Sequence, residues 1–234
     1  MAVRGLENAA LIGFAGDYTQ PSYIQKISEF LKRHQVRIVN LSIGLPKDNK
    51  NELGLRDVIK TMRDMIQANP ETLFVVAAGN EEKNLDENQN RQYPASFNFP
   101  NVLKVGALDA TSFEGLTTEN AKMADYSNTG KESVDILAPG KDLMAASLGG
   151  GLIAHTGTSM ASPVAANAIA RLWIQFPHLT AAEVRSLVIA TAHPLAVPVD
   201  IGSRGFLDIE AAKTKVTEYP YAAPSESRGR RPRR

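Results

Sequence analysis

Short apolar runs alternate with amphipathic segments along most of this chain, and that alternation constrains the fold more than any other feature. The apolar runs cover residues 9–15, 37–43, 73–78, 102–107 and 134–138. Between them, apolar residues recur at 3.6-residue spacing over 24–31 and 55–66, which predicts helices. Continuous apolar strands are typical of parallel sheets covered on both faces. We therefore expect an α/β fold with a doubly wound, mainly parallel sheet, helices on both faces, and residues 9–15 as a buried strand.

The composition is typical of a folded chain without cysteine. The 234 residues are 43% hydrophobic and 22% charged, with a formal net charge of +1. This length suffices for one domain with a substantial core. The absence of cysteine excludes disulfides, zinc–thiolate sites and thiol nucleophiles. No apolar run approaches the roughly 20 residues that cross a bilayer, so we expect no membrane protein.

The C-terminal end differs from the rest in composition. From Ser225 the sequence is Ser-Glu-Ser-Arg-Gly-Arg-Arg-Pro-Arg-Arg, which is too polar to fold. We expect one domain over residues 1–216 and a disordered basic tail over 217–234. A basic tail can contact nucleic acid or anionic lipid, but this run is the sole evidence, and we do not expect a nucleic-acid partner.

Residues 155–173 combine a polar turn with a helix of small residues. The polar residues 156–159 lead into an alanine-rich stretch, which places Ser159 at or just before the first helical turn. Pro163 is expected in that first turn, where its missing N–H breaks no intrahelical bond. The Ser159 hydroxyl would lie at the positive end of the helix dipole. Helix-start chemistry alone favours a plain N-cap for such a serine.

The string Gly157-Thr158-Ser159-Met160-Ala161-Ser162-Pro163 resembles the nucleophile motif of the subtilisin-like serine peptidases, the subtilases. The resemblance implies a subtilisin-like fold and peptide-bond hydrolysis through an acyl-enzyme on Ser159. The family motif usually continues with His-Val-Ala-Gly, whereas Val164-Ala165-Ala166-Asn167 follows here. No cofactor is expected in this chemistry. Subtilases often bind structural calcium, but no acidic loop in this sequence assigns its ligands.

Residues 77–81, Ala-Ala-Gly-Asn-Glu, resemble the subtilase segment that carries the oxyanion-hole asparagine. Acyl transfer places negative charge on the former carbonyl oxygen, and a fixed amide N–H stabilises that charge. Alone, an asparagine after a strand more simply tolerates a left-handed turn. Its place about eighty residues before Ser159 favours the oxyanion role for Asn80.

Residues 39–44 resemble the family strand whose end pairs with the extended substrate. That mode is strand addition, in which main-chain hydrogen bonds hold the peptide. A plain core strand explains residues 39–44 equally well. With this resemblance, the expected lining of the substrate cleft is Ser42, Ile43, Gly44, Ala77, Ala78 and Gly79. Further segments, among them 93–95, 126–130 and 135–140, follow the family in order, so the likeness covers roughly residues 36–192.

The base and carboxylate that activate a serine are missing from the sequence. A serine hydroxyl is a weak nucleophile until a base takes its proton. In subtilases an Asp-Thr/Ser-Gly stretch and a His-Gly-Thr-His-type stretch precede the segments above. Here Asp17 is followed by Tyr-Thr, and no histidine precedes His34. His155, four residues before Ser159, is expected to be hydrogen-bonded within the fold or to face solvent, and the other histidines to be surface or cap residues.

Three interpretations of the incomplete triad stay open. With this resemblance, residues 1–216 are expected to be the C-terminal two-thirds of a subtilase catalytic domain that lacks its N-terminal portion. The sequence is a truncated product that has lost the Asp and His segments, or one half of a split peptidase completed by an N-terminal chain bearing Asp and His, or a non-catalytic relative that binds peptides. A ligand-binding α/β domain with a fortuitous motif is a remote fourth. A polypeptide is the expected substrate or ligand. The family expectation for location is extracellular, although the first residues lack the apolar core of a signal peptide.

Overall fold

A six-stranded sheet runs through the centre of the computed structural model, which describes residues 9–46 and 53–218. Its order is β1-β3-β5-β6-β10-β9. The bounds are β1 Ile38–Leu41, β3 Leu73–Ala77, β5 Val102–Leu108, β6 Ile136–Pro139, β10 Gly205–Phe206 and β9 His193–Pro194. The first five strands are parallel, and β9 is antiparallel to β10. This confirms the mainly parallel sheet.

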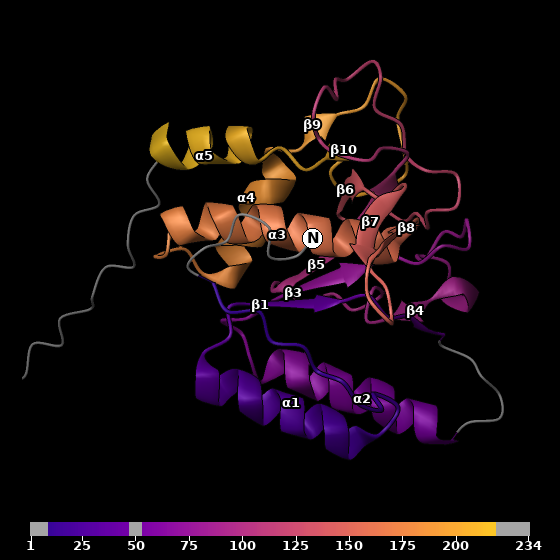
Figure 1. Ribbon diagram of the computed structural model, residues 1–234, viewed down its shortest axis with the longest axis vertical. Helices are drawn as coiled ribbons and strands as arrows, with labels where there is room; N and C mark the ends of the chain where they lie inside the picture. The colour runs from indigo at the N-terminus through magenta and orange to yellow at the C-terminus, as the bar shows by residue number, and fades with distance from the viewer. Residues whose placement is uncertain (1–8, 47–52, 219–234) are drawn as a thin grey trace, which may run out of the picture.

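Helices cover both faces of the sheet, which confirms the doubly wound arrangement (Figure 1). On one face lie α1 Pro21–His34 and α2 Leu53–Gln67. On the other lie α3 Thr158–Gln175, α4 Ala181–Ala190 and α5 Ile209–Glu218. At the start of α4, Thr180 and Glu183 form a reciprocal capping box, the arrangement that a Thr-x-x-Glu spacing favours.

Side chains of β3 alternate between two cores, as the period of a strand requires. Leu73 and Val75 belong to the core beneath α3, α4 and α5. Phe74 and Val76 belong to the core beneath α1 and α2. Because both faces of this strand are covered, every one of its residues is apolar and buried.

Small residues bring α3 close to the sheet. Ala161 and Ala165 are fully buried against it, in the same core as Val75 of β3 and Val105 of β5. At the far end of α3, the indole nitrogen of Trp173 donates to the carbonyl oxygen of Leu179 (2.8 Å). This bond fixes the C-terminal end of α3, while the N-terminus of the helix lies near the carboxyl ends of the strands.

The expected strand over residues 9–15 is wrong. These residues form no strand, and Leu11, Ile12 and Phe14 are exposed, Leu11 by 63%. A strand needs a neighbour to complete its backbone hydrogen bonds, and residues 9–15 pair with no strand of the described sheet, whose edge strand on this side is β1. Phe14 instead packs edge-on against Phe30 of α1, with ring centroids 5.0 Å apart.

Smaller elements lie around the carboxyl ends of the parallel strands. β2 Leu45–Pro46 pairs with β4 Gln92–Tyr93, which follows the short helix η1 Asn88–Asn90. A hairpin of β7 Leu143–Ala146 and β8 Leu152–His155 directly precedes α3. Sequence analysis did not identify this hairpin.

The C-terminal helix α5 continues to Glu218, so the domain boundary expected at residue 216 falls inside a helix. The rest of the expected tail, 219–234, lies outside the described residues. Within 9–46 and 53–218, no helix combines the length and apolar character that a membrane crossing requires.

Candidate active site

Three polar residues from distant parts of the sequence meet where β1 and β3 end. Ser42 directly follows β1, Asn80 follows β3 after Ala78 and Gly79, and Ser159 is the second residue of α3. Asn80 is exposed, and Ser159 and Ser42 are half-buried. The carboxyl ends of parallel strands are the usual place for functional groups in an α/β sheet, as the sequence predicts.

Thr158 fixes the orientation of the Asn80 amide. The Oδ1 atom of Asn80 accepts the backbone N–H of Thr158 (2.8 Å) and its hydroxyl (3.0 Å). The Thr158 Oγ1 atom in turn accepts the N–H of Gly79 (3.0 Å). Because Oδ1 is occupied by two donors, the amide cannot flip without losing both bonds. The Nδ2 atom, which carries two N–H donors, therefore has a fixed direction.

The Asn80 amide and the Ser159 hydroxyl border one small space that Gly157 keeps open. Gly157 has a φ of 148°, which L side chains rarely adopt. A Cβ atom at this position would lie 3.3 Å from Ser159 Oγ and 3.4 Å from Asn80 Nδ2. An atom in the space between them could contact both groups. The start of α3 adds the positive end of a helix dipole to the same place.

Gly157 is itself held by the loop after β6. Its N–H donates to the carbonyl oxygen of Gly140 (2.8 Å), which also accepts the Tyr126 hydroxyl (3.0 Å). Burial raises the pKa of Tyr126 above its ordinary value. The phenol therefore stays protonated at neutral pH and remains a donor to this carbonyl.

Pro163 lies in the second turn of α3, not in the first turn as expected. The helix begins at Thr158, so Pro163 is its sixth residue. Its missing N–H would have been the helical partner of the Ser159 carbonyl, four residues earlier. The Ser42 hydroxyl donates to that carbonyl instead (2.8 Å). The misplacement arose because the helix begins before Ser159 and not after it.

The residues expected to line a substrate cleft differ in whether their backbone N–H and C=O groups are already hydrogen-bonded. Ser42, Ile43 and Gly44 make no bond to other backbone groups of the described chain. By contrast, Ala77 and Ala78 are buried. Gly79 uses both backbone groups, its N–H on Thr158 and its carbonyl on the N–H of Asn128.

Asn128 is a supporting residue that sequence reasoning missed. It is fully buried, and its Oδ1 accepts the N–H groups of Glu81 and Lys83 at 3.1 and 2.9 Å. Its Nδ2 donates to the Ala78 carbonyl (3.0 Å). Asn128 thus holds the loop on both sides of Asn80. The family-like string over 126–130 was the one available signal for it.

No histidine or carboxylate within the described residues hydrogen-bonds the Ser159 hydroxyl. His155 is exposed on β8, as expected, and His34 stacks on Phe30 at 4.1 Å between ring centroids. His193 is half-buried, with its Nε2 3.1 Å from the Thr118 hydroxyl and its Nδ1 3.5 Å from Asp208. The described part of the chain therefore supplies the Ser159 hydroxyl and the Asn80 amide donor, but no base that hydrogen-bonds the hydroxyl.

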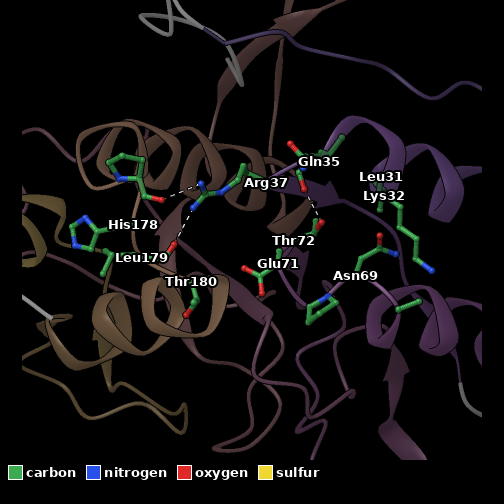
Figure 2. Close-up of a pocket in the computed structure, with 14 residues that line it drawn as sticks. Leu31, Lys32, Gln35, Arg37, Asn69, Glu71, Thr72, His178, Leu179 and Thr180 are labelled. Carbon is green, nitrogen blue, oxygen red and sulfur yellow. Dashed lines mark hydrogen bonds between the residues drawn. The ribbon is translucent and has the colours of Figure 1, made fainter. Parts of the chain in front are cut away.

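A cavity of about 470 Å³ lies at the amino ends of β1 and β3, opposite the end of the strands that carries Ser42 and Asn80. Figure 2 shows Arg37 crossing it and donating to the carbonyl oxygens of Pro177 (3.2 Å) and Leu179 (2.9 Å). The guanidinium also lies over the Trp173 ring, 4.0 Å from its centroid. Arg37 thereby joins the start of β1 to the loop after α3, and Ser42, Asn80 and Ser159 are not among the residues that line this cavity.

Acidic and histidine side chains do not gather into a metal site in the part of the chain that the structure describes. No group of three or more His, Cys, Asp or Glu residues there could hold a metal ion. The structural calcium that the resemblance implies gains no ligand set from these residues and stays a prediction.

Relatives of known sequence cover most of this chain. A subtilisin of Bacillus pumilus is 28% identical over 193 residues, which are 82% of this chain and 62% of that protein. Subtilisin E of Bacillus subtilis (strain 168) has the same identity over 45% of its own length. A cell wall-associated protease of that strain is 34% identical over 153 residues, 63% of this chain and 15% of the relative. The chain spans about half the length of the subtilisins it matches.

Solved structures agree with the fold. The prenylagaramide maturation protease PagA is 26% identical with a TM-score of 0.61, over 90% of this chain and 71% of that one. A cold-adapted subtilisin-like serine proteinase, at 21% identity and a TM-score of 0.57, covers 81% of this chain and 60% of its own and supports the fold alone. The model of the subtilase family matches residues 4–225. The chain therefore belongs to the subtilase family of serine proteases.

Proposed function

We propose that Ser159 is the nucleophile of a serine endopeptidase reaction and that Asn80 supplies an oxyanion donor. The observation that carries this proposal is the fixed Asn80 amide, whose Nδ2 borders the same space as the Ser159 hydroxyl. A donor that needs no reorientation when charge develops is the main requirement for stabilising an oxyanion.

The proposed reaction proceeds through an acyl-enzyme. The Ser159 oxygen attacks the carbonyl carbon of the scissile peptide while a base takes its proton. The carbonyl oxygen becomes negative and accepts the Asn80 N–H at the positive end of α3. When the C–N bond breaks, the base returns the proton to the leaving amine. Water then hydrolyses the ester and restores the serine.

A second segment has to supply the base. We propose that a histidine and a carboxylate come from a polypeptide segment not among the described residues, in the same protein or in a second chain. Two observations support this proposal: Ser159 Oγ and Asn80 Nδ2 border one space beside Gly157, and no histidine within 9–46 and 53–218 hydrogen-bonds the serine.

The substrate is proposed to be an extended polypeptide that pairs with residues 42–44. Their backbone groups have no partner in the backbone of the described chain, and they directly follow the edge strand β1. Free N–H and C=O groups beside an edge strand are what strand addition requires. Ala77, Ala78 and Gly79 would then contribute shape, because Ala78 and Gly79 already use their backbone groups on Val105, Asn128 and Thr158.

A peptide-binding module without catalysis is the second candidate. It is favoured by the backbone of residues 42–44, which has no backbone partner in the described chain, and by the absence there of a base hydrogen-bonded to Ser159. Such a protein would bind extended peptides and leave them intact.

A fluorophosphonate probe separates the two candidates, because it reacts with an activated serine. The recombinant chain is labelled alone and with a polypeptide that bears the Asp and His motifs, and protein isolated from the native source is labelled in parallel. Mass spectrometry should place the label on Ser159, and Ser159→Ala should abolish it. Ser147→Ala, in the β7–β8 turn, is the matched control and should label normally. Absence of label under every condition would refute the enzyme proposal and leave peptide binding.

A further inference from the structure

The carbonyl group of Ser159 lacks the partner that a helix normally provides. In an α-helix the carbonyl of residue i accepts the N–H of residue i+4. For Ser159 that residue is Pro163, which has no N–H. A half-buried carbonyl without a hydrogen-bond partner is destabilising, so this position needs a donor from elsewhere.

A directed chain of side-chain hydrogen bonds supplies that donor. Ser162, fully buried in α3, donates its hydroxyl to Asn40 Oδ1 (2.6 Å). Asn40 Nδ2 donates to Ser42 Oγ (3.0 Å), and Ser42 donates to the Ser159 carbonyl (2.8 Å). Because Asn40 donates into the Ser42 oxygen, the single Ser42 proton is directed at Ser159.

The chain begins and ends on the first two turns of α3 and passes through the end of β1. It therefore ties the main chain of Ser159 to β1, whose extension over residues 42–44 makes no backbone–backbone hydrogen bond within the described residues. We propose that Ser42 is a positioning residue for Ser159, with Asn40 orienting its hydroxyl, and that Pro163 makes this bond necessary. The kinetic consequence rests on the proposed function; the hydrogen bond itself does not.

The hydrogen bond from the Ser42 hydroxyl to the Ser159 carbonyl can be detected by NMR. Ser159-Met160 is the one Ser-Met pair in the sequence. Labelling with 1-¹³C-serine and ¹⁵N-methionine therefore gives a single HNCO peak, which reports the Ser159 carbonyl. Ser42→Ala should shift its carbonyl resonance upfield, and Ser42→Thr, which keeps the hydroxyl, should hold it near the original position. Ser147→Ala is the matched control and should leave it unchanged.

The role of Pro163 is tested in a double-mutant cycle. Pro163→Ala restores the helical N–H, so the Ser159 carbonyl keeps one donor when Ser42 is truncated. The shift caused by Ser42→Ala should fall to less than half in the Pro163→Ala background. An equal shift in both backgrounds, or none in either, would overturn the proposal. If Ser42→Ala does not fold, Pro163→Ala is compared with the Ser42→Ala/Pro163→Ala double variant. A large difference between their Ser159 carbonyl resonances would also contradict the proposal.

The positioning role has a separate kinetic readout. In a preparation that labels, Ser42→Ala should slow fluorophosphonate labelling of Ser159 about tenfold, the equivalent of one hydrogen bond. Ser42→Thr should restore the rate, and so should the addition of Pro163→Ala to Ser42→Ala. A wild-type chain that never labels would contradict the proposed function, while the HNCO result would still decide the hydrogen bond.

Discussion

The side-chain oxygen of Asn80 is bound twice by Thr158, the residue directly before Ser159. Thr158 is fully buried and begins α3, whereas Asn80 is exposed after β3. The pair therefore joins a sheet loop to a helix start at the point where both border the Ser159 hydroxyl. The direction of the Asn80 amide is thus fixed within the fold, and the oxyanion role proposed for it would need such preorganisation.

Asn80→Asp should test the donor with little change of shape. The substitution keeps the oxygen that Thr158 binds and replaces the Nδ2 donor by a second oxygen. Loss of one such donor costs about 2.7–4 kcal/mol in the transition state, a magnitude known from a subtilisin. We expect fluorophosphonate labelling of Ser159 to slow about 100- to 1,000-fold, measured under conditions in which the probe labels the wild-type protein. A variant that folds normally and labels at the wild-type rate would exclude Asn80 from the oxyanion site.

Thr158→Val should test the support beneath Asn80. Valine has nearly the same shape but no hydroxyl, so the N–H of Gly79 loses its acceptor and Asn80 loses one of two donors. Gly79 is half-buried, and an unpaired donor costs at most about 1–3 kcal/mol. We expect that loss in the free energy of unfolding measured in urea, and Thr158→Ser should recover most of it. Equal stabilities for the Val and Ser variants would show that these bonds contribute little.

The parts of the fold that follow from local pattern could be predicted from the sequence. The runs at 73–78 and 102–107 are continuous because β3 and β5 are buried on both faces. The Thr180–Glu183 capping box depends on residues three apart, so its spacing is visible in the sequence. The meeting of Asn80 with Ser159 could be predicted only because both belong to family-like strings.

The parts that failed depend on partners distant in sequence. Residues 9–15 have the composition of a strand, but a strand also needs a neighbour, and these residues pair with no strand of the described sheet. The Asn80–Thr158 bonds join residues 78 positions apart, and no periodicity reveals them. The role of Asn128 was missed for the same reason. Pro163 was misplaced because polar residues 158–159 look like a turn, whereas the structure includes them in α3.

Gly157→Ala should separate activity from stability. An alanine there would adopt a backbone conformation that costs about 1–3 kcal/mol, and its Cβ would lie between the Ser159 hydroxyl and the Asn80 amide. We expect labelling of Ser159 to be lost even under conditions where the variant remains folded. The matched control is Gly115→Ala, which also has a positive φ (72°) but no neighbouring atom within 4 Å. It should lose stability by about 1–2 kcal/mol and still label, and equal effects of the two variants would contradict the obstruction.

Leu11→Ala and Leu103→Ala should measure whether residues 9–15 contribute to the core. Both positions lie in apolar runs that sequence analysis treated alike, but Leu11 is 63% exposed whereas Leu103 is fully buried in β5. Truncating a buried leucine costs about 2–5 kcal/mol, while an exposed substitution usually changes stability by about 0.5 kcal/mol or less. Urea unfolding of the two variants should therefore differ severalfold in the free energy lost. A loss at Leu11 as large as that at Leu103 would mean that the 9–15 segment is buried in solution, against another part of the protein or a second chain.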